Sequence, residues 1–234
     1  MTNPLIEVVA STLHSCIEAE KGGAGRIELC AALDTAGVTP SLGLFLEVKK
    51  HVKIPVFVMI RPREGDFLYS DTDIKVMEAD IAVFKQHGAD GFVFGCLTKE
   101  GNVDVALTSR LVEQCEPLPV TFHRAFDLTP DLFEALEDVI EAGCTRILTS
   151  GGMSTINPAS AAMIQELAEE AEDRIIIMPG GGVTKEKMSY LQYDILFEYH
   201  HSARQQIQSP HSSDLFEMNY KETVAERVAI TSAK

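Results

Sequence analysis

The chain has 234 residues, 45% of them hydrophobic, which is enough to bury a full core as one large domain or two small ones. It carries 20 Lys and Arg against 35 Asp and Glu, and the net charge of −15 excludes nonspecific binding to nucleic acid or to an anionic membrane surface. No apolar run approaches the roughly 20 residues of a membrane span, and the five cysteines form no CxxC pair, so we expect a cytoplasmic protein with free thiols.

Short apolar segments alternate with helical ones along the whole chain. We expect strands at 5–9, 26–30, 54–61, 91–95, 119–122, 146–149, 175–178 and 196–200. Helices are predicted at about 12–21, 41–51, 71–87, 105–115, 131–142 and 158–171, with a short one after the turn PGGGVT. The predicted N-terminal caps are Ser11 or Thr12, Thr39 or Ser41, Asp71 or Thr72, Asp131, and Thr129 followed by Pro130.

Three joints between a helix and the next strand resemble each other: GGAGRIEL, HGADGFVF and AGCTRILT. Each has a helix-ending glycine, a few small or polar residues, and then an apolar strand. Eight such units in this length predict an α/β fold, a (β/α)8 TIM-type barrel, as a single domain over 1–234. Residues 203–221 are expected to form a loop and 222–233 a terminal helix. A doubly wound open sheet is the alternative, disfavoured because no GxGxxG follows the first strand.

Polar side chains gather where the predicted strands end, most densely in LPVTFHRAFD and IPVFVMIRPR. Side chains alternate along a strand, so the apolar pattern predicts which polar residues point into the barrel mouth: Glu7, Glu28, Arg61, His123 and His200. The loops above would carry Arg63, Asp66, Arg124 and Asp127. Buried charges are costly unless paired, so this convergence indicates a site. In the alternative interpretation, Glu7 and Glu28 simply neutralise Arg61 and Arg124 in a structural network.

As a site, this set has a definite chemistry. Three arginines, Arg61, Arg63 and Arg124, would hold a carboxylate or a phosphate of a small anionic ligand. The turn Gly180, Gly181, Gly182 would add backbone N–H donors, as phosphate sites in many barrels do. The groups that would move protons, and are therefore the catalytic candidates, are Glu7, Glu28 and His123.

Read in order, RIELCAA, TPSLG, IPVFVMIRPREGDFLYSD, GNVD, LPVTFHRAFD, RILTSGG and IIIMPGGGV strongly resemble the CutC family of copper homeostasis proteins. The resemblance implies a TIM-type barrel, a cytoplasmic location, a homo-oligomer and a link to copper. The family's polar residues fall on the same set: Glu7, Glu28, Arg61, Arg63, Asp66, His123, Arg124, Asp127 and His200.

A copper site proposed for the family uses two cysteines near the ends of the first two strands. Cys30 matches one of these positions, and Val9 stands at the other. Cu(I) prefers thiolate ligands, so Cys30 is the metal candidate that the resemblance implies. Two functions therefore stand side by side: copper homeostasis with copper ion binding, and an enzyme or sensor for a small phosphorylated or carboxylated metabolite at the barrel mouth.

Overall fold

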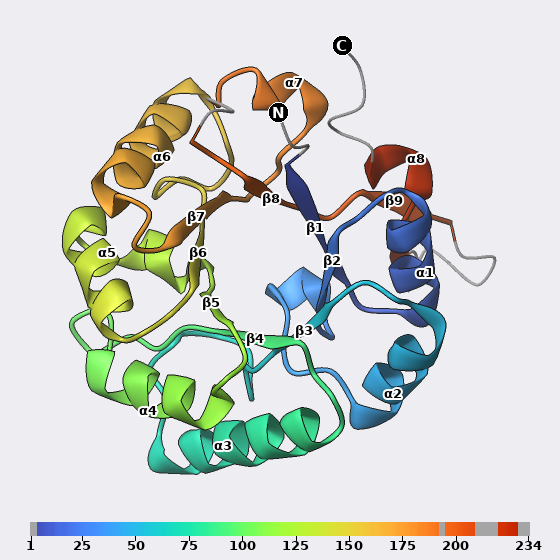
Figure 1. Ribbon diagram of the computed structural model, residues 1–234, viewed down its shortest axis with the longest axis horizontal. Helices are drawn as coiled ribbons and strands as arrows, with labels where there is room; N and C mark the ends of the chain where they lie inside the picture. Colours follow the sequence, from blue (N-terminus) through green and yellow to red (C-terminus); the bar gives the residue numbers. More distant parts are fainter. Residues whose placement is uncertain (1–3, 192–194, 209–219, 229–234) are drawn as a thin grey trace, which may run out of the picture.

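The computed structural model describes residues 4–191, 195–208 and 220–228. Eight parallel strands form one sheet in the order β7-β6-β5-β4-β3-β2-β1-β8, which curls until its two outer strands lie side by side (Figure 1). The strands are β1 Leu5–Ala10, β2 Arg26–Leu29, β3 Val56–Met59, β4 Gly91–Phe94, β5 Val120–Phe122, β6 Arg146–Thr149, β7 Ile176–Pro179 and β8 Glu198–His201. The predicted TIM-type barrel is confirmed.

A ring of helices covers the outer face of these strands (Figure 1), and side chains fill the inside of the barrel. The strands are therefore almost entirely buried. The helices are α1 Leu13–Lys21, α2 Leu42–His51, α3 Asp71–Gln86, α4 Val105–Cys115, α5 Leu132–Glu141, α6 Pro158–Ala171 and the short α7 Lys185–Met188. Two 3₁₀ turns, η1 Leu33–Thr35 and η2 Arg124–Leu128, follow β2 and β5. Within the described ranges, none of the helices combines the length and apolarity needed to cross a membrane.

Helix ends follow the predicted chemistry at most positions. Thr12 and Ser41 accept hydrogen bonds from backbone N–H groups three residues on, and one glycine in each repeated joint, Gly23, Gly88 or Gly143, has positive φ. Two cap predictions were wrong. Ser70 begins α3 in a capping box with Asp73, and neither Asp71 nor Thr72 is the cap. Asp131 caps α5, whereas Thr129 closes the 3₁₀ turn before it.

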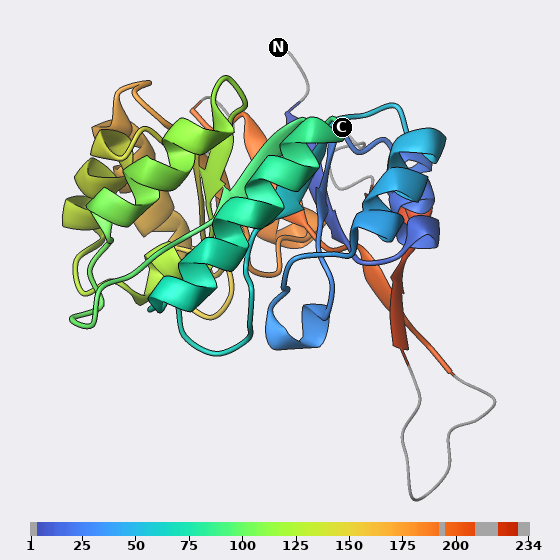
Figure 2. The same cartoon turned by 90° about the horizontal axis from the view of Figure 1, so that it is seen from below.

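The C-terminal part differs from the expected loop and long helix. Strand β9 (Arg204–Ile207) pairs antiparallel with β10 (Tyr220–Thr223), and the hairpin stands out on the same side of the barrel as η1 (Figure 2). Helix α8 spans only Ala225–Val228, and the rest of the predicted segments, 209–219 and 229–233, lies outside the described residues. The strand residues are mostly polar because much of the hairpin is exposed, so they lack the apolar alternation that predicts a strand.

Large and small side chains alternate at the bottom of the barrel interior. Phe57 on β3 fills the space beside Gly91 on β4, where an added Cβ would lie 2.6 Å from the Phe57 ring. Two guanidinium groups, those of Arg26 and Arg146, lie over the same ring at 4.8 and 5.5 Å from its centroid. Charged side chains therefore fill part of the barrel interior, directly below the C-terminal ends of the strands.

Candidate functional site

Glu7 is the centre of a buried network because of its register in the sheet. On one side β1 pairs Glu7 with Arg26 of β2, and on the other with His200 of β8. Its carboxylate accepts hydrogen bonds from Arg26 Nε at 2.5 Å and from His200 Nδ1 at 2.8 Å. Burial alone would raise the pKa of Glu7, but the charge of Arg26 and the His200 hydrogen bond lower it to about 2. Glu7 is thus a permanent anion that holds its neighbours in place.

Below Glu7 the network continues through residues that the sequence reasoning did not select as site residues. Arg26 also donates to Glu198 at 2.5 Å, and Glu198 accepts two further hydrogen bonds from Arg146, at 2.6 and 2.9 Å. Arg26 and Arg146 are 4% and 5% exposed, so these ion pairs are buried. Strand alternation could have predicted that these arginines point inward, because Arg26 shares its face of the strand with Glu28 and Arg146 shares its face with Leu148.

Glu28 approaches the same nitrogen of His200 as Glu7 does. Its Oε2 is 3.8 Å from His200 Nδ1, and although this oxygen is buried, no described residue donates a hydrogen bond to it. Burial raises the pKa of Glu28 to about 7; the charge of His200 opposes that rise and the charge of Glu7 adds to it. Burial opposes protonation of His200, but the hydrogen bond to Glu7 and the charges of Glu28 and Glu7 raise its pKa. A proton can therefore reside on either residue near neutral pH.

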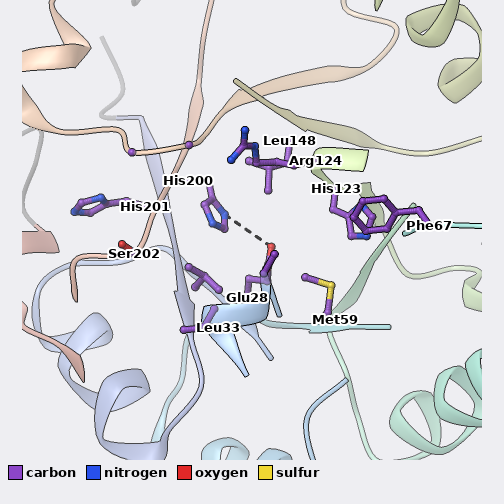
Figure 3. Close-up of a pocket in the computed structure, with 14 residues that line it drawn as sticks. Glu28, Leu33, Met59, Phe67, His123, Arg124, Leu148, His200, His201 and Ser202 are labelled. Carbon is purple, nitrogen blue, oxygen red and sulfur yellow. Dashed lines mark ion pairs between the residues drawn. The ribbon is translucent and has the colours of Figure 1, made fainter. Parts of the chain in front are cut away.

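A cavity of about 250 Å³ opens above this pair at the C-terminal ends of the strands (Figure 3). Its polar walls are Glu28, His123, Arg124, His200, His201, Ser202, Gly181 and Gly182. Its apolar walls are Val9, Leu33, Ala36, Met59, Phe67 and Leu148. The volume suits a small molecule rather than a polymer, and the apolar walls strengthen any electrostatic contact made inside.

His123 enters the cavity from the end of β5 with a fixed ring. The backbone N–H of Ala125 donates to His123 Nδ1 at 3.2 Å, so Nδ1 carries no proton and Nε2 carries it. The ring packs against Phe67 at 4.7 Å between centroids and against Gly95, where a Cβ would lie 2.6 Å from Nδ1. Burial and then the charge of Arg61 lower the pKa of His123 to about 3, so the ring is neutral.

Arg124 brings a positive charge to the rim. It donates to Asp127 at 2.8 Å and to Ser150 Oγ at 2.6 Å, while its Nη1 has no partner among the described residues. Asp127 accepts from Thr149 Oγ1, Ser150 and the Gly152 N–H, so it holds the loop after β6 rather than facing a ligand. Gly181 has φ of +88° and lies so close to Arg124 that a Cβ would be 3.3 Å from Nη1.

Other predicted ligand residues have different roles in the geometry. Arg61 points inward as predicted, but it donates to the carbonyls of Thr35, Gly37 and Gly65 at 2.7–2.8 Å, which ties two loops together. Arg63 pairs with Asp66 on the loop before α3 and with Asp73 in the first turn of α3, and it is not among the residues that line the cavity. Gly180 faces Leu148, and its N–H donates to Thr149.

Comparison with known proteins places these residues in a family. The CutC family model matches residues 4–205. The chain belongs to the CutC family. It is 50% identical over 201 residues to the copper homeostasis protein cutC homolog of Mus musculus, covering 86% of this chain and 74% of that protein. The Homo sapiens homolog is also 50% identical, over 86% of this chain and 73% of its own length. The solved structure of CutC from Streptococcus agalactiae has a TM-score of 0.77 at 34% identity, covering 84% and 97% of the two chains.

These CutC relatives are named for copper, and Cys30 is the side chain at which the resemblance places a copper ligand. The Cys30 thiol is fully buried next to Gly37 and Met59, does not line the cavity, and contacts the Ala10 carbonyl at 3.8 Å. Burial strongly raises its pKa, so the thiolate that Cu(I) needs is disfavoured.

A second group of donors does not suit copper either. The carboxylates of Glu7 and Glu28 and the His200 ring offer donor atoms within 4.8 Å of one another. However, the guanidinium of Arg26 already supplies the positive charge that a cation would bring to Glu7. The raised pKa of His200 also favours a protonated ring, which cannot bind a metal ion. Carboxylates are also poor ligands for Cu(I). Neither Cys30 nor the Glu7–Glu28–His200 group is therefore well suited to Cu(I).

Proposed function

We propose that the barrel mouth binds a small anionic molecule and that Glu28 and His200 exchange protons with it. The observation that carries this proposal is the buried Glu28 Oε2, which lacks a hydrogen-bond donor among the described residues and whose carboxylate lines the cavity. Leaving a buried polar atom unpaired costs about 1–3 kcal/mol, so an unpaired atom on a side chain that lines a cavity supports a ligand at that position. A pKa near 7 also matches the requirement for a general acid or base.

The charge of the ligand is inferred from the rim. The chain as a whole is strongly acidic, yet the cavity is lined by Arg124 and by His200, whose pKa is raised. Arg124 Nη1 is the guanidinium nitrogen left free by its own contacts. A carboxylate or phosphate in the cavity, within reach of Arg124 Nη1, would gain that charge in a partly apolar surrounding.

Binding is tested by titrating inorganic phosphate and malonate, followed by calorimetry and by thermal shift. Arg124→Met should lose most of the binding. Arg63→Met is a matched control, because both arginines pair with an aspartate three residues on and their side chains are 38% and 37% exposed. Equal loss in the two variants, or no binding by the unmodified protein, would refute the proposal.

Copper binding is the second candidate, favoured by the names of the relatives. It is tested by anaerobic Cu(I) titration against a competing chelator, on the unmodified chain and on Cys30→Ser. Because the Cys30 thiol is buried and protonated, we expect weak binding that the substitution leaves unchanged. Tight binding at one equivalent that disappears in Cys30→Ser would instead establish Cys30 as a ligand. A cytoplasmic location and a homo-oligomer remain predictions.

A further inference from the structure

His123 and Glu28 are two buried groups of opposite character in one cavity. Both are at least 96% buried, with exposures of 4% and 3%, and each presents one atom without a partner among the described residues: Nε2 of His123 and Oε2 of Glu28. They come from β5 and β2, on different sides of the barrel, and enter the same cavity (Figure 3). The first atom is a hydrogen-bond donor and the second is an acceptor.

The donor is fixed as a donor by the backbone. Because the Ala125 N–H must donate to Nδ1, the imidazole proton can only be on Nε2. The imidazole ring is held in this orientation because it packs closely against the Gly95 backbone on one side and the Phe67 ring on another. Arg61, whose hydrogen bonds to the loop carbonyls keep it nearby, disfavours a second positive charge on the ring. A neutral imidazole N–H in an apolar pocket is suited to stabilising an oxygen that becomes negative.

The acceptor is placed to take a proton from carbon. Glu28 has no donor on Oε2 that would have to be displaced first, and His200 stands 3.8 Å away as the group that can stabilise its charge. The wall next to it is apolar, with Met59 and Leu33, so a carboxylate there is poorly solvated and correspondingly basic. Arg124 at the rim leaves the centre of the cavity for the reacting part of a short anionic molecule.

We propose that the site removes a proton from a carbon next to a carbonyl group, with Glu28 as the base and the His123 Nε2–H as the donor to the carbonyl oxygen. This inference rests on the proposed binding of a small anion and names its class: a carbonyl compound that carries a carboxylate or a phosphate.

In the forward step the C–H bond breaks and its proton passes to Glu28. The electron pair moves into the carbon–carbon bond, the carbonyl π pair moves onto oxygen, and His123 stabilises the resulting enolate. Return of the proton to the same carbon or to its neighbour gives exchange, inversion or isomerisation. No oxidant, reductant or second substrate is needed.

The experiment is deuterium incorporation in D₂O, followed by ¹H NMR on dihydroxyacetone phosphate and on pyruvate, against a protein-free blank. The unmodified protein should exchange the protons next to the carbonyl of at least one of the two. Glu28→Gln should lower this exchange by about 10²–10⁴-fold. His123→Phe should lower it by on the order of 10²-fold or more without weakening phosphate binding. Glu28→Asp, which keeps a carboxylate, should retain part of the activity.

The outcomes separate this inference from the binding proposal. Phosphate binding that depends on Arg124, together with no exchange of either probe above the blank, overturns the inference and leaves the binding proposal standing. Exchange that survives in Glu28→Gln, with the variant folded by circular dichroism, also overturns it. If the protein binds neither phosphate nor malonate, both are overturned. Arg63→Met should behave as the unmodified protein throughout.

Discussion

Glu28→Gln should make the protein more stable above neutral pH while abolishing the proposed proton exchange. In the unfolded chain the pKa of a glutamate is near 4.5, and in the folded protein burial raises that of Glu28 to about 7. The folded state therefore holds a proton that the unfolded state has released, and stability falls as the pH rises from about 4.5 to 7. The difference corresponds to roughly 3 kcal/mol above pH 7, which is an upper figure because Glu28 and His200 titrate together.

Gln has the shape of the protonated glutamate and cannot ionise, so it should recover most of that free energy at pH 8.5 and almost none at pH 4.5. Urea denaturation of both proteins at the two pH values measures the difference. Glu47→Gln is the control, because Glu47 pairs with Lys50 on the outside of α2, with its side chain 49% exposed, and should change stability little at either pH. A Glu28→Gln protein that is less stable at pH 8.5 would show that Glu28 has a stabilising partner, and the reasoning would fail.

Two further substitutions separate scaffold from site. Arg26→Met leaves Glu7 buried without a guanidinium partner, while Glu198 keeps Arg146, and should lower the free energy of unfolding by about 3–5 kcal/mol. Arg110→Met, which breaks an exposed pair, should cost less than about 1 kcal/mol. Similar losses for the two variants in urea denaturation would contradict this. Arg61→Met removes donors from three carbonyls and should cost roughly 2–4 kcal/mol without weakening phosphate binding. Lost phosphate affinity at unchanged stability would return Arg61 to the ligand site.

The sequence was sufficient for the eight-stranded barrel, though not for the C-terminal hairpin, because each signal in the barrel has a local cause. Strand positions follow from apolar runs, and the positive-φ glycines at Gly23, Gly88 and Gly143 mark where helices end. Alternation along strands also gave the correct inward direction for Glu28 and His123. These predictions need only neighbours in the chain.

The roles of the inward residues could not be predicted in the same way. Which side chains meet inside a barrel depends on how far the strands are staggered, and this decides that Glu7 is paired with Arg26 and not with Arg61. Arg61 finds its acceptors in loop carbonyls, whose positions depend on positive φ angles at Ala36 and Gly37. Neither the stagger nor the loop conformations can be read from residue types alone.

The buried charges divide into two groups by whether they are satisfied. Arg26, Glu198 and Arg146 have their charges paired inside the barrel, so they contribute a rigid floor and nothing that can react. Glu7 connects this group to the cavity, because it accepts hydrogen bonds from both Arg26 and His200. Above it, Glu28 Oε2 and His123 Nε2 have no hydrogen-bond partner among the described residues, and both side chains line the cavity. Paired charges below the cavity and unpaired polar atoms inside it suit a preorganised site, because the reacting groups must be held in place while their reactive atoms stay free.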